Sequence, residues 1–264
     1  MLLNRPVFTQ HRFASYSLTV LATLVHRFTE TGTYQVAVSG RGRTRIDNLT
    51  VKEGAAHRQV NIDMAKPGNG PDKGGSHGCC CEPAAGRELA PGGVAAFYAS
   101  TGSGSYEVTI TQLGEREKRV VLSSAESLPA GDLFAVTLVR PGTYEVRDES
   151  STASAEVYIW IPKGERIRTE HVELVRLGEA GFEPDSLRLH AGQSIIIECG
   201  HDARVVVELR DPEKTAGATR PESGSRSNTS NSRSSTSKAS GETSGGESGS
   251  VPRKYTVRRP GHTR

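Results

Sequence analysis

The stretch Phe182–Cys199, FEPDSLRLHAGQSIIIEC, predicts two β-strands joined by a tight turn. In Ser186–His190 two leucines alternate with polar residues, which is the period-two pattern of a half-buried strand. Gly192 falls in the turn, where its freedom to adopt a positive φ angle is useful. The run Ser194–Glu198 contains three consecutive isoleucines, whose β-branched side chains favour a buried strand.

The same stretch resembles the opening hairpin of the cupredoxin family, plastocyanin-like β-sandwiches of which most bind copper. The shared pattern is F-x-P-x-x-L-x-L-x-x-G-Q-x-I-x-I. A second element, Val136–Val146, resembles the penultimate strand of that family and its Pro-Gly-Thr-Tyr turn. The element recurs as Phe28–Val36 and, cut short, as Tyr255–Thr263. Immunoglobulin-like sandwiches end a hairpin with a similar element, so both sandwich types are consistent with it.

Composition also favours an all-β protein. Only 34% of the residues are hydrophobic, and the shortage is concentrated in Lys66–Arg87 and Lys214–Ser250. The remainder is rich in β-branched residues, punctuated by glycine and free of long amphipathic helical pattern. The net charge of +3 is small and both signs are interspersed, so no nucleic-acid partner is indicated.

These patterns predict tandem small β-sandwich units, cupredoxin-like or immunoglobulin-like, joined by flexible linkers. We expect a partial sandwich of closing strands in 1–65, a Gly/Pro/Cys linker in 66–87, the most complete sandwich in 88–162, the opening strands of a third unit in 166–211, a disordered Ser/Gly-rich segment in 212–250, and a residual strand with a basic tail in 251–264. The first unit lacks its beginning and the third lacks its end. Pairing of these two units, within one chain or between chains, would cover their strand edges.

The family resemblance implies a copper site of two His, one Cys and one Met. Aligned on Val205-Val206, Ala203 occupies the position of the first His, and His201, two residues upstream, is a candidate ligand. The remaining ligands are expected after Tyr144, but Glu145–Thr152 contains no Cys, His or Met. The sequence therefore predicts a degenerate copper site.

A cysteine tract, Cys79, Cys80 and Cys81, lies in the expected linker close to His77. Consecutive Cys side chains diverge, so they cannot form the C-x-x-C bite of a zinc site. With His77 the thiols could hold a soft ion such as Cu(I). The alternative is a flexible linker with exposed thiols that are open to oxidation.

Two functions remain open on the sequence. The first is a non-enzymatic structural or binding module without a cofactor, whose partner is an unknown protein or envelope component. The alternative is a copper-handling or redox electron-transfer protein that uses the Cys79–Cys81 tract and nearby histidines. No nucleophile, base and orienting group can be named together, so an enzyme is not expected.

Location and assembly are the remaining expectations. The family resemblance implies an extracellular or cell-envelope protein, although the apolar part of Met1–Val25 lacks a small-x-small cleavage site. That stretch is also too short to span a bilayer, so no membrane span is expected. Self-association through unpaired strand edges is the one oligomeric contact that the pattern suggests.

Overall fold

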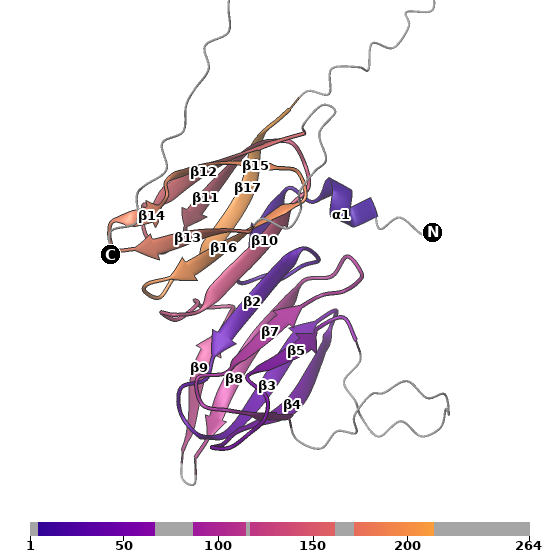
Figure 1. Ribbon diagram of the computed structural model, residues 1–264. Coiled ribbons are helices and arrows are strands. Elements are labelled where there is room, and N and C mark those ends of the chain that lie inside the picture. The colour runs from indigo at the N-terminus through magenta and orange to yellow at the C-terminus, as the bar shows by residue number, and fades with distance from the viewer. Residues whose placement is uncertain (1–4, 67–86, 115–116, 162–171, 214–264) are drawn as a thin grey trace, which may run out of the picture. The chain divides into compact units, whose positions relative to one another are not determined.

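Nearly every element of the chain is a β-strand, as the sequence predicts. The computed structural model describes residues 5–66, 87–114, 117–161 and 172–213, all within one compact unit, Met1–Ala216 (Figure 1). The only helix among these residues is α1 (Arg5–Thr9). No helix in the described residues is long and apolar enough to cross a membrane.

The strands form three sheets in a β-sandwich-like arrangement. The seven-stranded sheet contains, in spatial order, β14 (Gly181–Glu183), β13 (Val172–Gly178), β16 (Gln193–Cys199), β10 (Leu133–Leu138), β2 (Ala22–Arg27), β7 (Val94–Tyr98) and β5 (Gln59–Asp63). The β3 sheet contains β6 (Arg87–Leu89), β4 (Arg43–Val51), β3 (Gly32–Gly40), β8 (Tyr106–Leu113) and β9 (Lys118–Ser123). The β11 sheet contains β1 (Arg12–Ala14), β17 (Val205–Pro212), β11 (Gly142–Asp148), β12 (Ser154–Trp160) and β15 (Ser186–His190).

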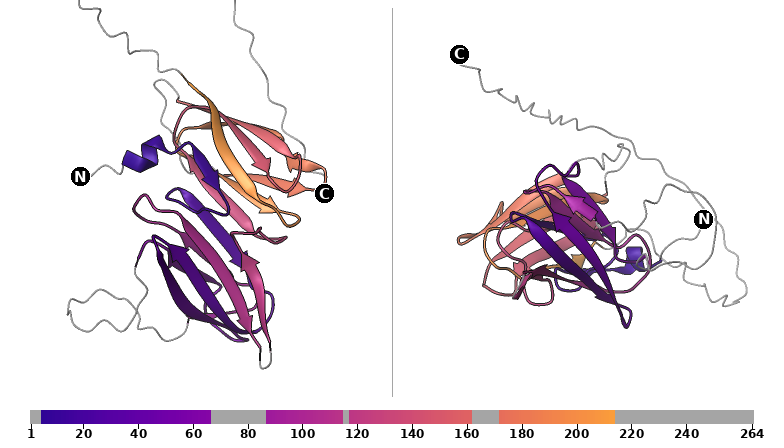
Figure 2. Two further views of the ribbon diagram at one scale, coloured as in Figure 1. Left: turned by 180° about the vertical axis from the view of Figure 1, so that it is seen from behind. Right: turned by 90° about the horizontal axis from the view of Figure 1, so that it is seen from below.

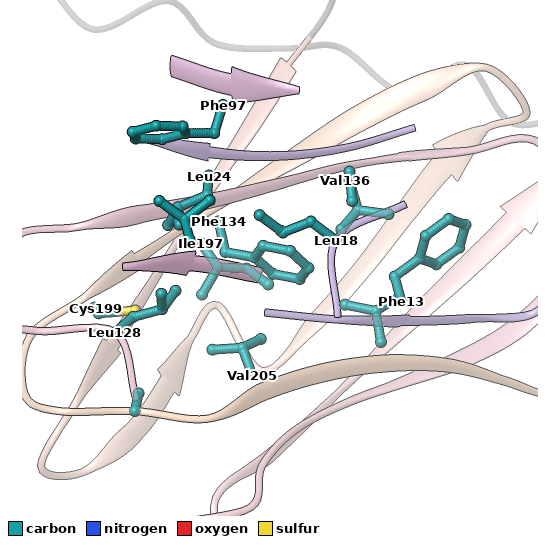
Figure 3. Close-up of a cluster of buried hydrophobic side chains, with 14 of the residues drawn as sticks. Phe13, Leu18, Leu24, Phe97, Leu128, Phe134, Val136, Ile197, Cys199 and Val205 are labelled. Atoms are coloured by element: carbon teal, nitrogen blue, oxygen red, sulfur yellow. The ribbon is translucent and has the colours of Figure 1, made fainter. Parts of the chain in front are cut away.

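The hydrophobic core follows from the period-two alternation of these strands. Leu24, Phe134 and Ile197 are in register on the neighbouring strands β2, β10 and β16, and each is fully buried. They point to one side of the seven-stranded sheet, where Leu128 and Cys199 also lie (Figure 3). One face of this sheet is therefore buried along most of its width.

We call β1–β8 the N-terminal half of the described chain and β9–β17 the C-terminal half. β1 and β9 are exchanged strands, because each joins a five-stranded sheet whose other four strands come from the other half. β1 precedes β2 in the sequence but pairs with β17, near the other end of the described chain. β9 precedes β10 but pairs with β8. The indigo N-terminal strand accordingly runs beside the orange strand β17 (Figure 1, Figure 2). β1, in the range expected to form the first unit, thus pairs with β17, in the range expected to open the third.

Both exchanged strands are held by the same hydrogen-bond device. The N–H of Ser15 donates to the carbonyl of Val205 at 2.9 Å, and the N–H of Val205 donates to Ser15 Oγ at 3.1 Å. The N–H of Ser124 donates to the carbonyl of Val108 at 2.9 Å, and the N–H of Val108 donates to Ser124 Oγ at 2.9 Å. Both serines are fully buried, so their hydroxyl groups satisfy backbone donors that water cannot reach.

A second repeated device follows each Gly-Thr-Tyr turn. Tyr34 donates its hydroxyl hydrogen to the carbonyl of Glu30 at 2.8 Å, and Tyr144 donates to the carbonyl of Arg140 at 3.1 Å. This bond to the carbonyl four residues upstream resembles the tyrosine corner of antiparallel sandwiches. It explains why the two turns share their tyrosine, because the ring fills the core while the hydroxyl group fixes the turn.

We expect Tyr144→Phe to lower the free energy of unfolding by about 1 kcal/mol, because the carbonyl of Arg140 loses a buried donor while the packing of the ring is kept. Urea unfolding followed by fluorescence measures the change. Tyr158→Phe is the matched control, since the Tyr158 ring, half-buried on β12, contacts the guanidinium of Arg188. An equal loss in both variants would contradict a role of the Tyr144 hydroxyl group in the fold.

The sequence and the structure agree on most strands and differ on their grouping. The predicted hairpin of Phe182–Cys199 forms β15 and β16, but these strands lie in different sheets. The range 88–162, expected to be one sandwich, contributes strands to all three sheets, because β8 pairs with β3 and β11 pairs with β17. The linker 67–86, the segment 214–250 and the third turn element in 251–264 lie outside the described residues.

Candidate functional site

The end of the β11 sheet at which the sequence places degenerate copper ligands contains a shallow surface hollow. Its volume is about 830 Å³, and its walls are the turn between β11 and β12, the segment 178–185 and the side chain of His201. His201 is one-third exposed, with 33% of its side chain accessible. Of the five candidate ligands, His201 is the one that the structure describes, since His77, Cys79, Cys80 and Cys81 lie outside the described residues.

Asp148 is the partner of His201. It is the last residue of β11, in the stretch after Tyr144 that the resemblance assigns to ligands, and its carboxylate is completely buried. Its Oδ1 accepts hydrogen bonds from the N–H groups of Ser150 at 3.0 Å and Arg204 at 2.9 Å. Its Oδ2 lies 3.5 Å from His201 Nε2. The carboxylate therefore ties β11 to the start of β17.

The electrostatics of Asp148 favour its charged form. Burial alone would raise the pKa of this carboxyl group. Hydrogen bonds from Ser151, Ser150, Arg204 and His201 outweigh burial and hold the pKa below its ordinary value. A carboxylate supplied with donors in this way is stable as an anion without a metal ion. Its surroundings are those of a structural group.

Ala203 stands where the resemblance places the first copper-binding His, and it is bound into the backbone network. Its N–H donates to the carbonyl of Leu128 at 2.9 Å, and the N–H of Leu128 donates to the carbonyl of Ala203 at 2.8 Å. Ala203 is fully buried. Within the described ranges, no cluster of three or more His, Cys, Asp or Glu side chains is placed to hold a metal ion.

A second His–carboxylate pair connects β2 with the residue before β10, and no local sequence pattern predicts it. His26 Nδ1, on β2, lies 2.8 and 2.9 Å from the two carboxylate oxygens of Asp132, which immediately precedes β10. Both side chains are buried, and burial raises the pKa of Asp132 while the hydrogen bond from His26 opposes that rise. A hollow of about 240 Å³ beside the pair is lined by Phe28, Tyr34 and Arg119 among others.

Cys199 is the free cysteine among the described residues, and it is buried at the end of β16. Burial and the nearby carboxylates raise the pKa of its thiol to about 12. The thiolate is the reactive form. The Cys199 thiol is therefore protected from reagents in two ways, because it is buried and because its raised pKa keeps it protonated.

We expect Cys199 to resist thiol reagents in the native state and to react within the mixing time in denaturant. The pKa of about 12 lowers the thiolate fraction at neutral pH about a thousandfold relative to an ordinary thiol. The measurement is absorbance after adding an aromatic disulfide to a variant that carries Cys79→Ser, Cys80→Ser and Cys81→Ser. Rapid native-state labelling of that variant would contradict the burial of Cys199.

The outward face of the seven-stranded sheet differs from the other outward faces. On its central strands six outward side chains are apolar and partly exposed, namely Ile196, Leu133, Ala135, Val25, Val94 and Ala96. The other outward positions of these strands carry Ser194, Glu198, Thr137, Thr23, Arg27 and Tyr98. On the neighbouring β13, Val172 is 51% exposed and Leu174 is 47% exposed. None of the described elements covers this face, which we call the apolar face.

The lateral sheets have the polar outward faces that half-solvated antiparallel sheets usually show. The β11 sheet carries an ion-pair network in which Arg147 and Arg210 contact Glu145 and Glu208. The β3 sheet presents polar side chains such as Gln35, Asn48 and Thr109, with Ile46 and Val120 as separate exposed apolar residues on β4 and β9. The contrast within one molecule marks the apolar face as a candidate binding surface.

Comparisons with known proteins give no family to which the chain can be assigned. No family model matches it, and neither a curated protein nor a solved structure gives a significant match.

Proposed function

We propose that the chain is a non-enzymatic, cupredoxin-like tandem β-sandwich that acts as a binding or structural module. In this proposal, the region around Asp148 and His201, where the resemblance places copper ligands, stabilises the fold and does not bind copper. The observation that carries the proposal is the environment of Asp148. Two backbone N–H groups and His201 engage its carboxylate from inside the fold. The Oδ1 atom is thereby committed to the sheet end, while the buried Oδ2 makes no well-formed hydrogen bond with the described residues and lies 3.5 Å from His201 Nε2.

The position of His201 supports the same conclusion. Its Nε2 lies 3.5 Å from Oδ2 of the buried Asp148 carboxylate, whose Oδ1 accepts two backbone hydrogen bonds. The thiol nearest in the sequence, Cys199, is buried at the end of β16. A blue-copper centre needs a Cys thiolate together with two His, and the described residues at this end of the sheet include no cluster of three His, Cys, Asp or Glu placed to hold a metal ion.

Copper titration tests the proposal. We expect Cu(II) to produce no intense thiolate-to-copper absorption band in the variant that carries serine at positions 79, 80 and 81. His201→Ala should leave its spectrum unchanged. A strong band in the triple variant that His201→Ala removes would overturn the proposal. A band in the wild-type chain that disappears in the triple variant would instead assign copper handling to the cysteine tract.

A further inference from the structure

We propose that the apolar face binds a second copy of this chain, so that two seven-stranded sheets pack face to face in a two-fold dimer. The inference rests on the proposed role as a binding module and names the partner. Sheets that pack in this way lie about 10 Å apart and interdigitate their outward side chains, with strand directions about 30° apart. A large apolar sheet face open to solvent is unusual in a monomer.

The size of the face is adequate for a stable interface. Seven strands spaced about 4.8 Å apart give a width of about 30 Å. Most strands present about three outward residues at intervals of about 6.6 Å, so the face is about 20 Å long. With its protruding side chains, such a face approaches the roughly 800 Å² that each partner contributes to a standard interface.

The distribution of charge on the face fits a second copy. Arg176 on β13 and Glu198 on β16 pair with each other at 3.2 Å, and Glu198 stands directly opposite Leu133 of β10. Arg27 lies at the end of β2. The Val25–Leu133 pair is itself uncharged, and the Glu198 carboxylate beside it is already paired with Arg176, so another copy meets a compensated charge there.

The register of the central strands specifies the contact. Val25 on β2 and Leu133 on β10 are directly opposite each other and both point outward. A two-fold axis that lies between the two sheets, parallel to the strands and between β2 and β10, places Val25 over Leu133 of the second copy. The same operation places Leu133 over Val25 of that copy, as an isologous interface requires.

Sedimentation velocity of the full chain under reducing conditions tests the proposal. We expect a monomer–dimer equilibrium between about 1 and 100 µM, and we expect Val25→Arg to weaken it at least about tenfold, or 1.4 kcal/mol. Leu133→Glu is a second variant, and circular dichroism and thermal melts confirm that each variant folds. Outward positions of a sheet tolerate a charge, so at least one of the two should fold.

Val120→Glu is the matched control. Val120 is 57% exposed and lies on β9, the edge strand of the β3 sheet, so a charge there disturbs edge pairing and leaves the apolar face intact. The dimer should persist in this variant. The proposal would be overturned if the wild-type chain stays monomeric. It would also be overturned if Val120→Glu dissociates the dimer while Val25→Arg and Leu133→Glu leave it intact. The copper titration is independent, so failure of the dimer leaves the role of Asp148 to be judged separately.

Discussion

Phe13→Ala should lower the free energy of unfolding by about 3–5 kcal/mol, since truncating a buried phenylalanine removes apolar burial and leaves a cavity. Phe13 is 1% exposed and lies on β1, the exchanged strand, opposite Val207 of β17 (Figure 3). The strand contains three residues, so one side chain supplies most of its contact with the core. Such a loss is a large fraction of the stability of a typical domain.

Chemical denaturation measures this loss, and Phe8→Ala provides the control. Phe8 lies in α1 and is 56% exposed, so its removal should change the stability by less than about 0.5 kcal/mol. Leu122 on β9 stands opposite Ile110 of β8 in the corresponding pairing, and Leu122→Ala should cost about 2–5 kcal/mol. Equal, small effects at Phe8 and Phe13 would show that β1 does not complete the β11 sheet in solution.

Asp148→Ala should lower the stability by about 3 kcal/mol, because the N–H groups of Ser150 and Arg204 both lose their hydrogen bond to an ionised acceptor. Asp148→Asn is the matched variant, since it keeps one acceptor oxygen and removes the charge. Its cost should be about half as large. His201→Ala should cost less than about 1 kcal/mol, because His201 is partly exposed and its contact is long.

The loss at Asp148 should depend on pH. The pKa of Asp148 is lower in the folded chain than in the unfolded chain, so its ionised form stabilises the fold above the ordinary aspartate pKa of about 4. This contribution disappears as the pH falls through the folded pKa. The difference in unfolding free energy between the wild type and Asp148→Asn should therefore shrink between about pH 5 and pH 3. A difference that stays constant over this range would mean that the charge is not stabilised by the fold.

The strands were predictable where their pattern is local. Alternating leucines in Ser186–His190 and the isoleucines of Ser194–Glu198 determine which side of a strand is buried, and β15 and β16 form there. The three-residue strand β1 is too short to carry a period, and its partner β17 lies at the other end of the described chain. Sheet membership depends on such distant pairings, which a local pattern does not contain.

The candidate site was predictable only in part, for a related reason. His201 was found because a family pattern pointed to its neighbourhood. The copper-ligand pattern after Tyr144 consists of Cys, His and Met, so it gives no indication of the buried carboxylate of Asp148. His26 and Asp132 are far apart in the sequence, and their contact arises from the pairing of β2 with β10. A histidine on an apolar strand gives no indication of its partner.

The exchange of β1 also constrains the order of events during synthesis. β1 leaves the ribosome first, but its partner β17 ends at Pro212, so the β11 sheet cannot close until nearly all of the described chain has been made. Contacts between residues far apart in sequence slow folding, because loop closure must precede the gain from pairing. The nascent chain therefore carries an open sheet edge for most of its translation, and a chaperone that covers that edge would raise the yield of folded protein.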